Sequence, residues 1–324
     1  MRVAQCVATV LASVIALAAV GSEKLDYPSR PIRLIVPFAP GGSVDISSRI
    51  LAAPLSEMLG QQVIVDNRAG GGGSVGATIV AKATPDGYTL LAGSSGSVTA
   101  NPALYSNLPY DSMRDFAPIS MINITPMVVL THPKMQVTGV KELIELARAQ
   151  PGKVTMASAG TGSSNHLAIE LFQIMSGAKF LHVPYKGSGA ALTELLGGQV
   201  QTMIDQIASS IGYIRDGRLR ALATTSNNRS TALPNVPTLD ELGMKGYEAA
   251  SFTGVLAPAG TPKAVVDRLY ASVVKAAKLP AVTDRFKDMA ADPKTTTPQE
   301  FAKFIQDDIA KWRKVTQAAN IKLD

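Results

Sequence analysis

Two short glycine turns carry the residue types best suited to chemistry in this sequence. Gly41-Gly42-Ser43 follows an apolar run that ends near Phe38, and Gly160-Thr161-Gly162-Ser163 follows one that ends near Ser158. Each turn opens a stretch with helical spacing, and a helix N-terminus attracts anions through its free N–H groups and its dipole. Glycine also lacks the Cβ that would keep a ligand away from the backbone. Facing each other, two such turns would clamp a carboxylate without an arginine.

Two readings of these residues remain open at this point. Either turn also suits a tight connection in which Ser163 only caps a helix. Asp205 follows the apolar run Val200–Ile204, which directs it towards the crevice of an open sheet as a ligand contact or as a cap of the next helix. His166 lies in the first turn of the helix after Ser163, where it would shape the cleft or support the loop.

Other motifs exclude several function classes. Gly71–Gly76 matches the G-x-G-x-x-G pattern, but the acid that a dinucleotide site needs about 20 residues later is absent. The sequence has no G-x-S-x-G, H-E-x-x-H or Walker lysine motif, and no spacing supplies His166 with a nucleophile and an orienting acid. We therefore predict no catalytic residue, no metal site and no cofactor.

The elements that position the turns alternate between strands and helices. Ile32–Val36, Val63–Val65 and Tyr88–Ala92 read as strands in a first block, and a second block repeats the pattern from Val154–Ala157 onward. The chain ends in two helices, at Pro262–Lys278 and Pro298–Ala319, each with a threonine cap before a proline. The pattern predicts an α/β fold with parallel sheets in two lobes, and C-terminal helices that pack on the first lobe.

Composition excludes several classes of protein, and the first residues predict that the chain is exported. The 324 residues include one Cys and three His, too few for a disulfide scaffold or a structural zinc site. The excess of 31 basic over 25 acidic residues is scattered, and 5% aromatic residues are too few for stacking platforms, so we predict no nucleic-acid binding. Arg2 and the apolar run Val7–Val20 predict a signal peptide at residues 1–21, which would remove Cys6 and send the protein to the periplasm.

A series of short motifs resembles the Bug-type substrate-binding proteins of the tripartite tricarboxylate transporter class. The series covers nearly the whole chain after the leader. Its members, in order, are Arg30-Pro31-Ile32, Val36–Asp45, Asp66-Asn67-Arg68, Pro85–Leu90, Leu108–Asp111, Ser158–Ser163 with His166, Val183–Gly187, Pro237-Thr238-Leu239 with Glu241, and Ala257–Pro262. Phe252 departs from the pattern, because many relatives carry tryptophan there, and this bears on ligand size.

The resemblance implies a type II Venus-flytrap fold with a hinge between two lobes. Lobe 1 would comprise residues 22–123 and 251–324, and lobe 2 residues 124–250, with linkers near Ile122–Met127 and Ala250–Val255. Carried over by motif, the carboxylate contacts are Phe38, Gly41, Gly42, Ser43, Ser158, Gly160, Thr161, Gly162, Ser163 and Asp205. Phe38 would supply an apolar wall.

The expected function is that of a monomeric periplasmic receptor that passes a small organic acid to membrane permease subunits. Dicarboxylates, an acidic amino acid and aromatic acids all remain open as ligands. One alternative is a sensor that signals to a membrane kinase. The other is an enzyme that acts on a carboxylate with His166 or Asp205 as base.

Overall fold

The computed structural model describes residues 26–226 and 228–318. The predicted signal peptide lies outside these residues. In chain order the elements are β1 (Ile32–Val36), α2 (Ser43–Leu59), β2 (Val63–Asn67), η1 (Gly71–Gly73), α3 (Ser74–Ala81), β3 (Thr89–Ser94), η2 (Ser95–Ala100), α4 (Asn101–Leu104), β4 (Phe116–Thr131), α5 (Val140–Ala149), β5 (Thr155–Ser158), α6 (Ser164–Ser176), β6 (Leu181–Pro184), α7 (Ser188–Leu196), β7 (Thr202–Gln206), α8 (Ile207–Arg215), β8 (Arg220–Thr224), β9 (Ala250–Pro258), α9 (Lys263–Ala277), α10 (Pro280–Asp288), β10 (Asp292–Pro293) and α11 (Pro298–Ala318).

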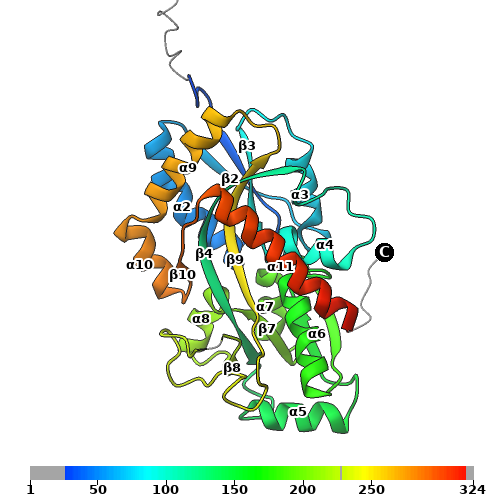
Figure 1. The fold of residues 1–324 in the computed structure, drawn as a ribbon. Helices are drawn as coiled ribbons and strands as arrows, with labels where there is room; N and C mark the ends of the chain where they lie inside the picture. The colour runs from blue at the N-terminus through cyan, green and yellow to red at the C-terminus, as the bar shows by residue number, and fades with distance from the viewer. Residues whose placement is uncertain (1–25, 227, 319–324) are drawn as a thin grey trace, which may run out of the picture.

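The strands form two half-sheets that share the long strand β4 (Figure 1). The first part of β4 pairs with β9 and β10, and β9 leads on to β3, β1 and β2. The last part pairs with β8 on one side and with β7 on the other, followed by β5 and β6. We call the first half, with α2, α3, α9 and α10, lobe 1, and the second half, with α5 to α8, lobe 2.

The prediction of parallel sheets is only partly right. Strands joined by a crossover helix pair in parallel, as β1 does with β2 and β3, and β5 with β6 and β7. Other pairs are antiparallel. In lobe 1, β9 pairs in this way with β3 and with β4, and in lobe 2, β4 pairs in this way with β7 and with β8. The reason is that the chain enters lobe 2 along β4 and returns along β9, so these two strands run in opposite directions.

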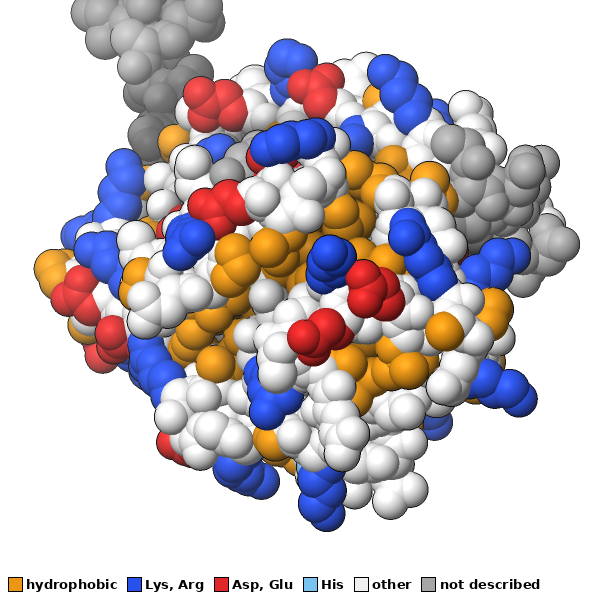
Figure 2. All heavy atoms as spheres, turned by 90° about the horizontal axis from the view of Figure 1, so that it is seen from below, with side chains coloured by type: hydrophobic (Ala, Val, Ile, Leu, Met, Phe, Trp, Pro, Cys, Tyr) orange, Lys and Arg blue, Asp and Glu red, His pale blue; other side chains and the backbone are white. Residues whose placement is uncertain are grey.

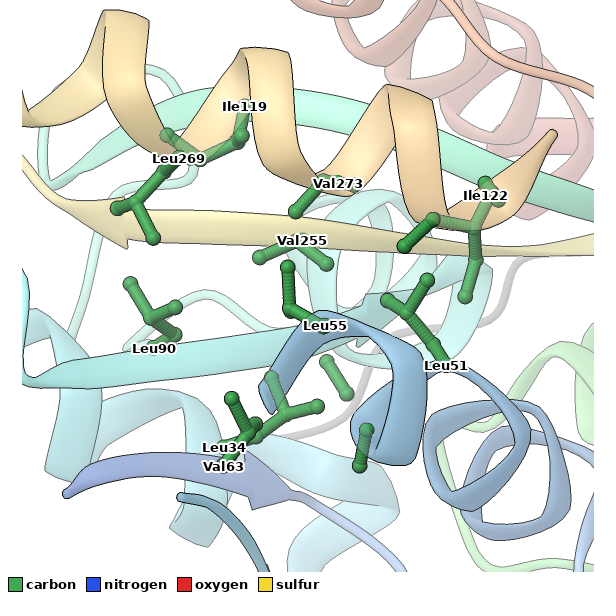
Figure 3. Close-up of a cluster of buried hydrophobic side chains, with 14 of the residues drawn as sticks. Leu34, Leu51, Leu55, Val63, Leu90, Ile119, Ile122, Val255, Leu269 and Val273 are labelled. Atoms are coloured by element: carbon green, nitrogen blue, oxygen red, sulfur yellow. The ribbon is translucent and has the colours of Figure 1, made fainter. Parts of the chain in front are cut away.

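The core of lobe 1 lies between its sheet and the helices α2 and α9 (Figure 3). Val265, Leu269 and Val273 recur every four residues on α9, so they form one apolar stripe. That stripe packs with Leu51 and Leu55 of α2, all at 5% exposure or less. Each such side chain contributes about 1.5–3 kcal/mol when it leaves water, which holds the helix that begins at Ser43 firmly on its sheet.

The chain passes between the lobes where β4 changes partners. Pro126 is the last residue of β4 that pairs with β9, and Met127 is the first that pairs with β7. The return passage comes at Ala250, the first residue of β9. Both points lie inside or beside the predicted linkers, but the lobe bounds at 123/124 and 250/251 stay a prediction.

The sequence predicted that the C-terminal helices pack on the first lobe, but α11 packs on both lobes. Its first turns place Phe301, Ile305 and Ile309 in a cluster with Leu91 and other residues of lobe 1. Further along, its Trp312 is fully buried in the main cluster of lobe 2. Figure 1 shows the helix crossing from the strands of lobe 1 to α6. The prediction missed this because the length of a helix does not say how many partners it crosses.

The two predicted threonine caps have different outcomes. Thr297 and Glu300 form the expected capping box, with backbone N–H groups donating to the partner side chains at 2.8 and 3.2 Å. The prediction of a cap at Thr261 is wrong. Helix α9 begins at Lys263, one residue later than predicted, and the hydroxyl of Thr261 donates to the carbonyl of Pro258.

The surface at the α5 end of lobe 2 carries no single charged patch. Figure 2 shows Lys and Arg side chains spread around this face, with acidic and apolar side chains between them. Among the helices of the described residues, none is long and apolar enough to cross a membrane.

Candidate functional site

A small polar cavity lies between the two lobes. Lobe 1 and the adjoining segments contribute Phe38, Gly42, Ser43, Val44, Ser94 and Ser251 to its wall, and lobe 2 contributes Ala159, Ser164, Asn165, Ser188 and Gln206. None of these side chains is charged. The cavity holds about 20 Å³, which is room for about one water molecule. A ligand larger than that enters only when the lobes move apart.

Four α-helices begin at this wall, and three of them have no side-chain cap. Gly42 precedes α2, Gly187 precedes α7 and Gln206 precedes α8, and none of the three accepts a first-turn N–H through its side chain. The fourth, α6, begins at Ser164. Uncapped first-turn N–H groups and the N-terminal ends of the helix dipoles favour negative charge at this wall. The arrangement suits an anion.

Most residues of the lobe 1 turn line the cavity, and one of them stabilises the turn instead. Phe38, Gly42 and Ser43 line the cavity, whereas Gly41 donates its N–H to the Asp45 carboxylate at 3.0 Å. Burial opposes the charge of Asp45, but hydrogen bonds from Arg49, Gly41 and Asn67 lower its pKa overall. Gly41 therefore fixes the turn through Asp45 instead of facing the cavity.

The predicted turn of lobe 2 lies mostly behind the cavity. Ser158 is within 2.6 Å of His182 Nε2 and accepts the N–H of Gly160. Gly162 donates its N–H to His166, and Ser163 caps α6 through the N–H of the same histidine. Ser158, Gly162 and Ser163 are absent from the cavity wall, so their contacts shape the loop.

Asp205 lies inside β7 and not after it, because β7 begins later than predicted and ends at Gln206. It is fully buried and is not part of the cavity wall. Its carboxylate accepts from Ser188 Oγ at 2.6 Å and from Asn165 Nδ2 at 2.8 Å. Burial raises its pKa, while these bonds and one from Ser209 act in the other direction. Asp205 thus orients two side chains that do line the cavity.

Sequence reasoning missed several residues of the wall. Ser188 follows Gly187 at the start of α7, so a search for further glycine turns that open helices would have found it. Gln206 bridges Ser164 (3.1 Å) and Ser188 (3.4 Å) from the start of α8. Ser94 and Ser251 lie on β3 and β9, and no local pattern marks them.

A wider groove opens outside the cavity and shares Phe38 and Ala159 with it. Its volume is about 500 Å³, and its wall includes the glycine run 70–73, Gly160, Thr161 and Lys186. Lys186 is the one charged residue in that wall and is exposed. The groove therefore adds a positive charge next to a cavity that has none.

The lobes touch each other around these spaces. The N–H of Ala39 donates to the carbonyl of Lys186 at 3.2 Å. Gly72 approaches the carbonyl of Thr161 so closely that an added Cβ would lie 2.1 Å from its oxygen. The structure is thus that of the closed arrangement.

Within the described residues, neither the cavity nor its surroundings offers a group of three or more metal-ligating side chains. His166 is absent from the walls of the cavity and the groove, and its Nδ1 already accepts an N–H. The walls contain hydroxyl, amide and backbone groups, which bind and orient a ligand.

Comparison with known proteins identifies the family. The sequence model of the family "Tripartite tricarboxylate transporter family receptor" matches residues 47–321. BugT of Bordetella pertussis is 42% identical over 298 residues, which is 92% of this chain and 91% of BugT.

Two solved structures share the fold. Rpa4515 of R. palustris with adipate is 37% identical with a TM-score of 0.89, and covers 92% of this chain and 99% of its own. MatC (Rpa3494) from Rhodopseudomonas palustris with bound malate is 32% identical with a TM-score of 0.87, and covers 89% and 99%. The two-lobed Venus-flytrap fold and the resemblance drawn from the motifs are confirmed. The chain belongs to the receptor family of the tripartite tricarboxylate transporters.

Proposed function

We propose that this receptor binds a small carboxylate in the cavity between the lobes. The observation that carries the proposal is the convergence of three uncapped helix starts, at Gly42, Gly187 and Gln206, on one uncharged wall. A carboxylate that replaces water there accepts several N–H and O–H bonds, each about 1.5–3 kcal/mol when one partner is charged. A cation would meet the positive ends of the same helices.

The groove outside the cavity favours an acid with a second anionic group. One carboxylate, which is larger than the one water molecule that the fully closed cavity admits, would widen the cavity slightly, and the rest of the ligand would extend past Phe38 and Ala159 towards Lys186. The relatives solved with adipate and with malate hold acids of this kind. An acidic amino acid fits the same description, because its side chain supplies the second carboxylate.

The family supports a compartment and a partner for this receptor. The predicted signal peptide at residues 1–21 would deliver the receptor to the periplasm. Closure around the acid would present both lobes as one surface, and we propose that permease subunits of the transporter recognise this closed form. The receptor itself would act without catalysis, because its role ends when the acid is released.

The proposal is tested by thermal unfolding with adipate, malate and hexanoate, each at increasing concentration. An acid at 100 times its Kd adds about 2.7 kcal/mol, which raises the Tm of a protein of this size by a few degrees. We expect adipate or malate to raise the Tm more than hexanoate, which has one carboxylate. A Lys186→Met variant should lose that preference. Lys179→Met should keep it, because Lys179 is also exposed but lies outside the walls of the cavity and the groove.

The role of the helix start is tested with two matched glycines. Gly42 and Gly139 both precede helices, but an added Cβ at Gly42 meets Ser188 at 3.5 Å, whereas Gly139 faces open space. Gly42→Val should abolish the stabilisation by every acid, and Gly139→Val should preserve it. Stabilisation that survives in Gly42→Val, or wild-type protein that no acid stabilises, would contradict the proposal.

A further inference from the structure

Two of the three histidines stack against each other behind the cavity. The rings of His166, on α6, and His182, on β6, lie 4.2 Å apart between centroids and 11° from parallel. His166 is 6% exposed, and His182 is partly buried. Neither ring lines the cavity or the groove, so neither is a ligand contact.

Both rings hold the loop between β5 and α6. His166 Nδ1 accepts the N–H of Gly162 at 3.2 Å. His182 Nε2 lies 2.6 Å from the hydroxyl of Ser158, which also accepts the N–H of Gly160 at 3.1 Å. The two imidazoles therefore fix both ends of this loop, which contributes Ala159 to the cavity and Thr161 to the groove.

We propose that His166 and His182 are positioning residues for the 158–163 loop, and that uptake of a proton by this pair weakens binding of the acid. The inference rests on the proposed function, because it assumes that the acid binds against this loop. Through this pair, the affinity of the receptor for the acid would depend on pH.

The geometry explains why the neutral pair is needed. An N–H group points at His166 Nδ1, so that nitrogen must carry a lone pair, and a proton added there would face another proton. A positive charge on either ring would also lie 4.2 Å from the other ring, which opposes a second proton. Burial lowers the pKa of His182 to about 4, and His166 adds to this shift.

The charged groups around the pair are few. On α6, the carboxylate of Glu170 lies 3.5 Å from His166 Nε2 and favours a proton on that ring. Neither β5 nor the rest of β6 has an ionisable side chain, and Asp205 of the neighbouring β7 bonds Asn165, Ser188 and Ser209. Tyr105 reaches only the carbonyl of Thr161. On α11, which also packs on α6, Asp308 bonds Thr99 and Trp312.

The first test is the Kd for adipate, and in parallel for malate, measured by calorimetry from pH 7.5 down to pH 4.0, the range that reaches the lowered pKa of His182. Wild-type affinity should fall by about tenfold more than protonation of the acid alone produces, since one linked proton changes affinity by up to about tenfold per pH unit. His166→Ala should weaken binding at every pH. In His166→Asn the Oδ1 atom can still accept from Gly162 but binds no proton, so affinity at pH 7.5 should recover in part. The extra fall should become smaller, because only His182 still takes up a proton.

The third histidine provides a matched control. His132 also accepts a backbone N–H through Nδ1, from Lys134, but it lies outside both walls. His132→Asn should keep the wild-type pH profile. If His166→Asn also keeps that profile, the proposed coupling is wrong.

A second measurement needs no ligand and uses the wild-type protein. The amide resonance of Gly162 should move with pH in step with the imidazole resonances of His166, because proton uptake breaks their hydrogen bond. A Gly162 amide resonance that stays still while the imidazole resonances of His166 move would overturn the inference, whether or not any acid binds. If the amide moves but neither adipate nor malate binds at any pH, the pair holds the loop as inferred and the proposed function fails instead.

Discussion

The closed arrangement depends on the absence of a side chain at Gly72. Its φ is +60°, and a Cβ added there would lie 2.1 Å from the carbonyl oxygen of Thr161 on the other lobe. Because that oxygen belongs to the backbone, the loop cannot rotate it away. We expect Gly72→Ala to prevent full closure and to weaken adipate binding at least about tenfold, measured by calorimetry.

A second glycine separates this clash from the cost of the backbone conformation. Gly152 has φ +71° and nothing within 4 Å of an added Cβ. Gly152→Ala therefore carries the same cost of about 1–2 kcal/mol for a left-handed alanine without touching the other lobe. Equal affinities of the two variants would show that the Gly72 contact does not control closure.

The stability of the protein should fall in acid because of His182. The pKa of this histidine is lowered to about 4 by burial and by His166, whereas an exposed histidine titrates near 6.5. The unfolded chain therefore binds the proton first as the pH falls. The free energy of unfolding should decrease between about pH 6.5 and pH 4 by up to about 3 kcal/mol from this group and level off below.

Urea unfolding at four pH values between 7.5 and 4 measures this effect. His182→Gln should show a smaller decrease than wild type, since the glutamine amide does not titrate. His132→Gln should follow wild type. A wild-type slope that persists in His182→Gln would remove this histidine as the cause.

The sequence predicted individual residues where the pattern was local. Gly42 and Ser43 could be placed at the cavity because a glycine turn at a helix start has a defined geometry. Ser158 and Ser163 could not be placed, because a serine that caps a helix and one that faces a ligand occupy the same sequence position. Asp205 shows the same limit: a boundary shift in β7 turns an edge position into a buried one.

Helix α11 contacts both lobes, as the strands β4 and β9 do. Trp312 is fully buried in the lobe 2 cluster, and its Nε1 donates to Asp308 at 3.1 Å. Trp312→Ala should lower the free energy of unfolding by about 3–5 kcal/mol, the usual cost of removing a large core side chain. Trp312→Phe should cost less, because most of the apolar volume remains.

The neighbouring Arg313 supplies the control for this helix. It is exposed on the same turn of α11, so Arg313→Ala should change the unfolding energy by no more than about 0.5 kcal/mol. Urea unfolding followed by circular dichroism compares the three variants. If Trp312→Ala were no less stable than Arg313→Ala, α11 would not contribute to the core of lobe 2.

At the scale of elements, the sequence predicted types better than partners. The strand–helix alternation located β1, β2, β3, β5, α9 and α11 within about two residues, since apolar periodicity is local. It did not predict the strands β4 and β9 or the helices α5, α7, α8 and α10. The antiparallel pairing of β4 with β9, and the contact of α11 with both lobes, depend on residues more than a hundred positions apart. Periodicity contains no information about such pairs.

The molecule as a whole was predicted from the order of its motifs, not from the physics of any one of them. The two blocks suggested two lobes, but only the resemblance indicated that the lobes close on each other. The closed arrangement itself depends on contacts such as that between Ala39 and Lys186, which no segment reveals by itself.

A disulfide between the lobes provides the test at this scale. The Cβ position of Gly42 lies 3.5 Å from the Cβ of Ser188, within the range of about 3.5–4.5 Å that a disulfide needs, and Gly42 has an ordinary φ of −84°. We expect Gly42→Cys with Ser188→Cys, made together with Cys6→Ser, to form this bond under mild oxidation. Loss of free thiols at low protein concentration would report it.

The oxidised protein should scatter X-rays with the radius of gyration of this closed structure and should bind no adipate, because the acid cannot enter. Reduction should restore a larger average radius. A pair of Gly139→Cys and Ser188→Cys should keep both thiols free, since Gly139 faces open space. If the Gly42 pair also keeps its thiols free, or if the oxidised protein is no more compact than the reduced one, the lobes do not meet in solution at the starts of α2 and α7, and the acid would have to be held by one lobe.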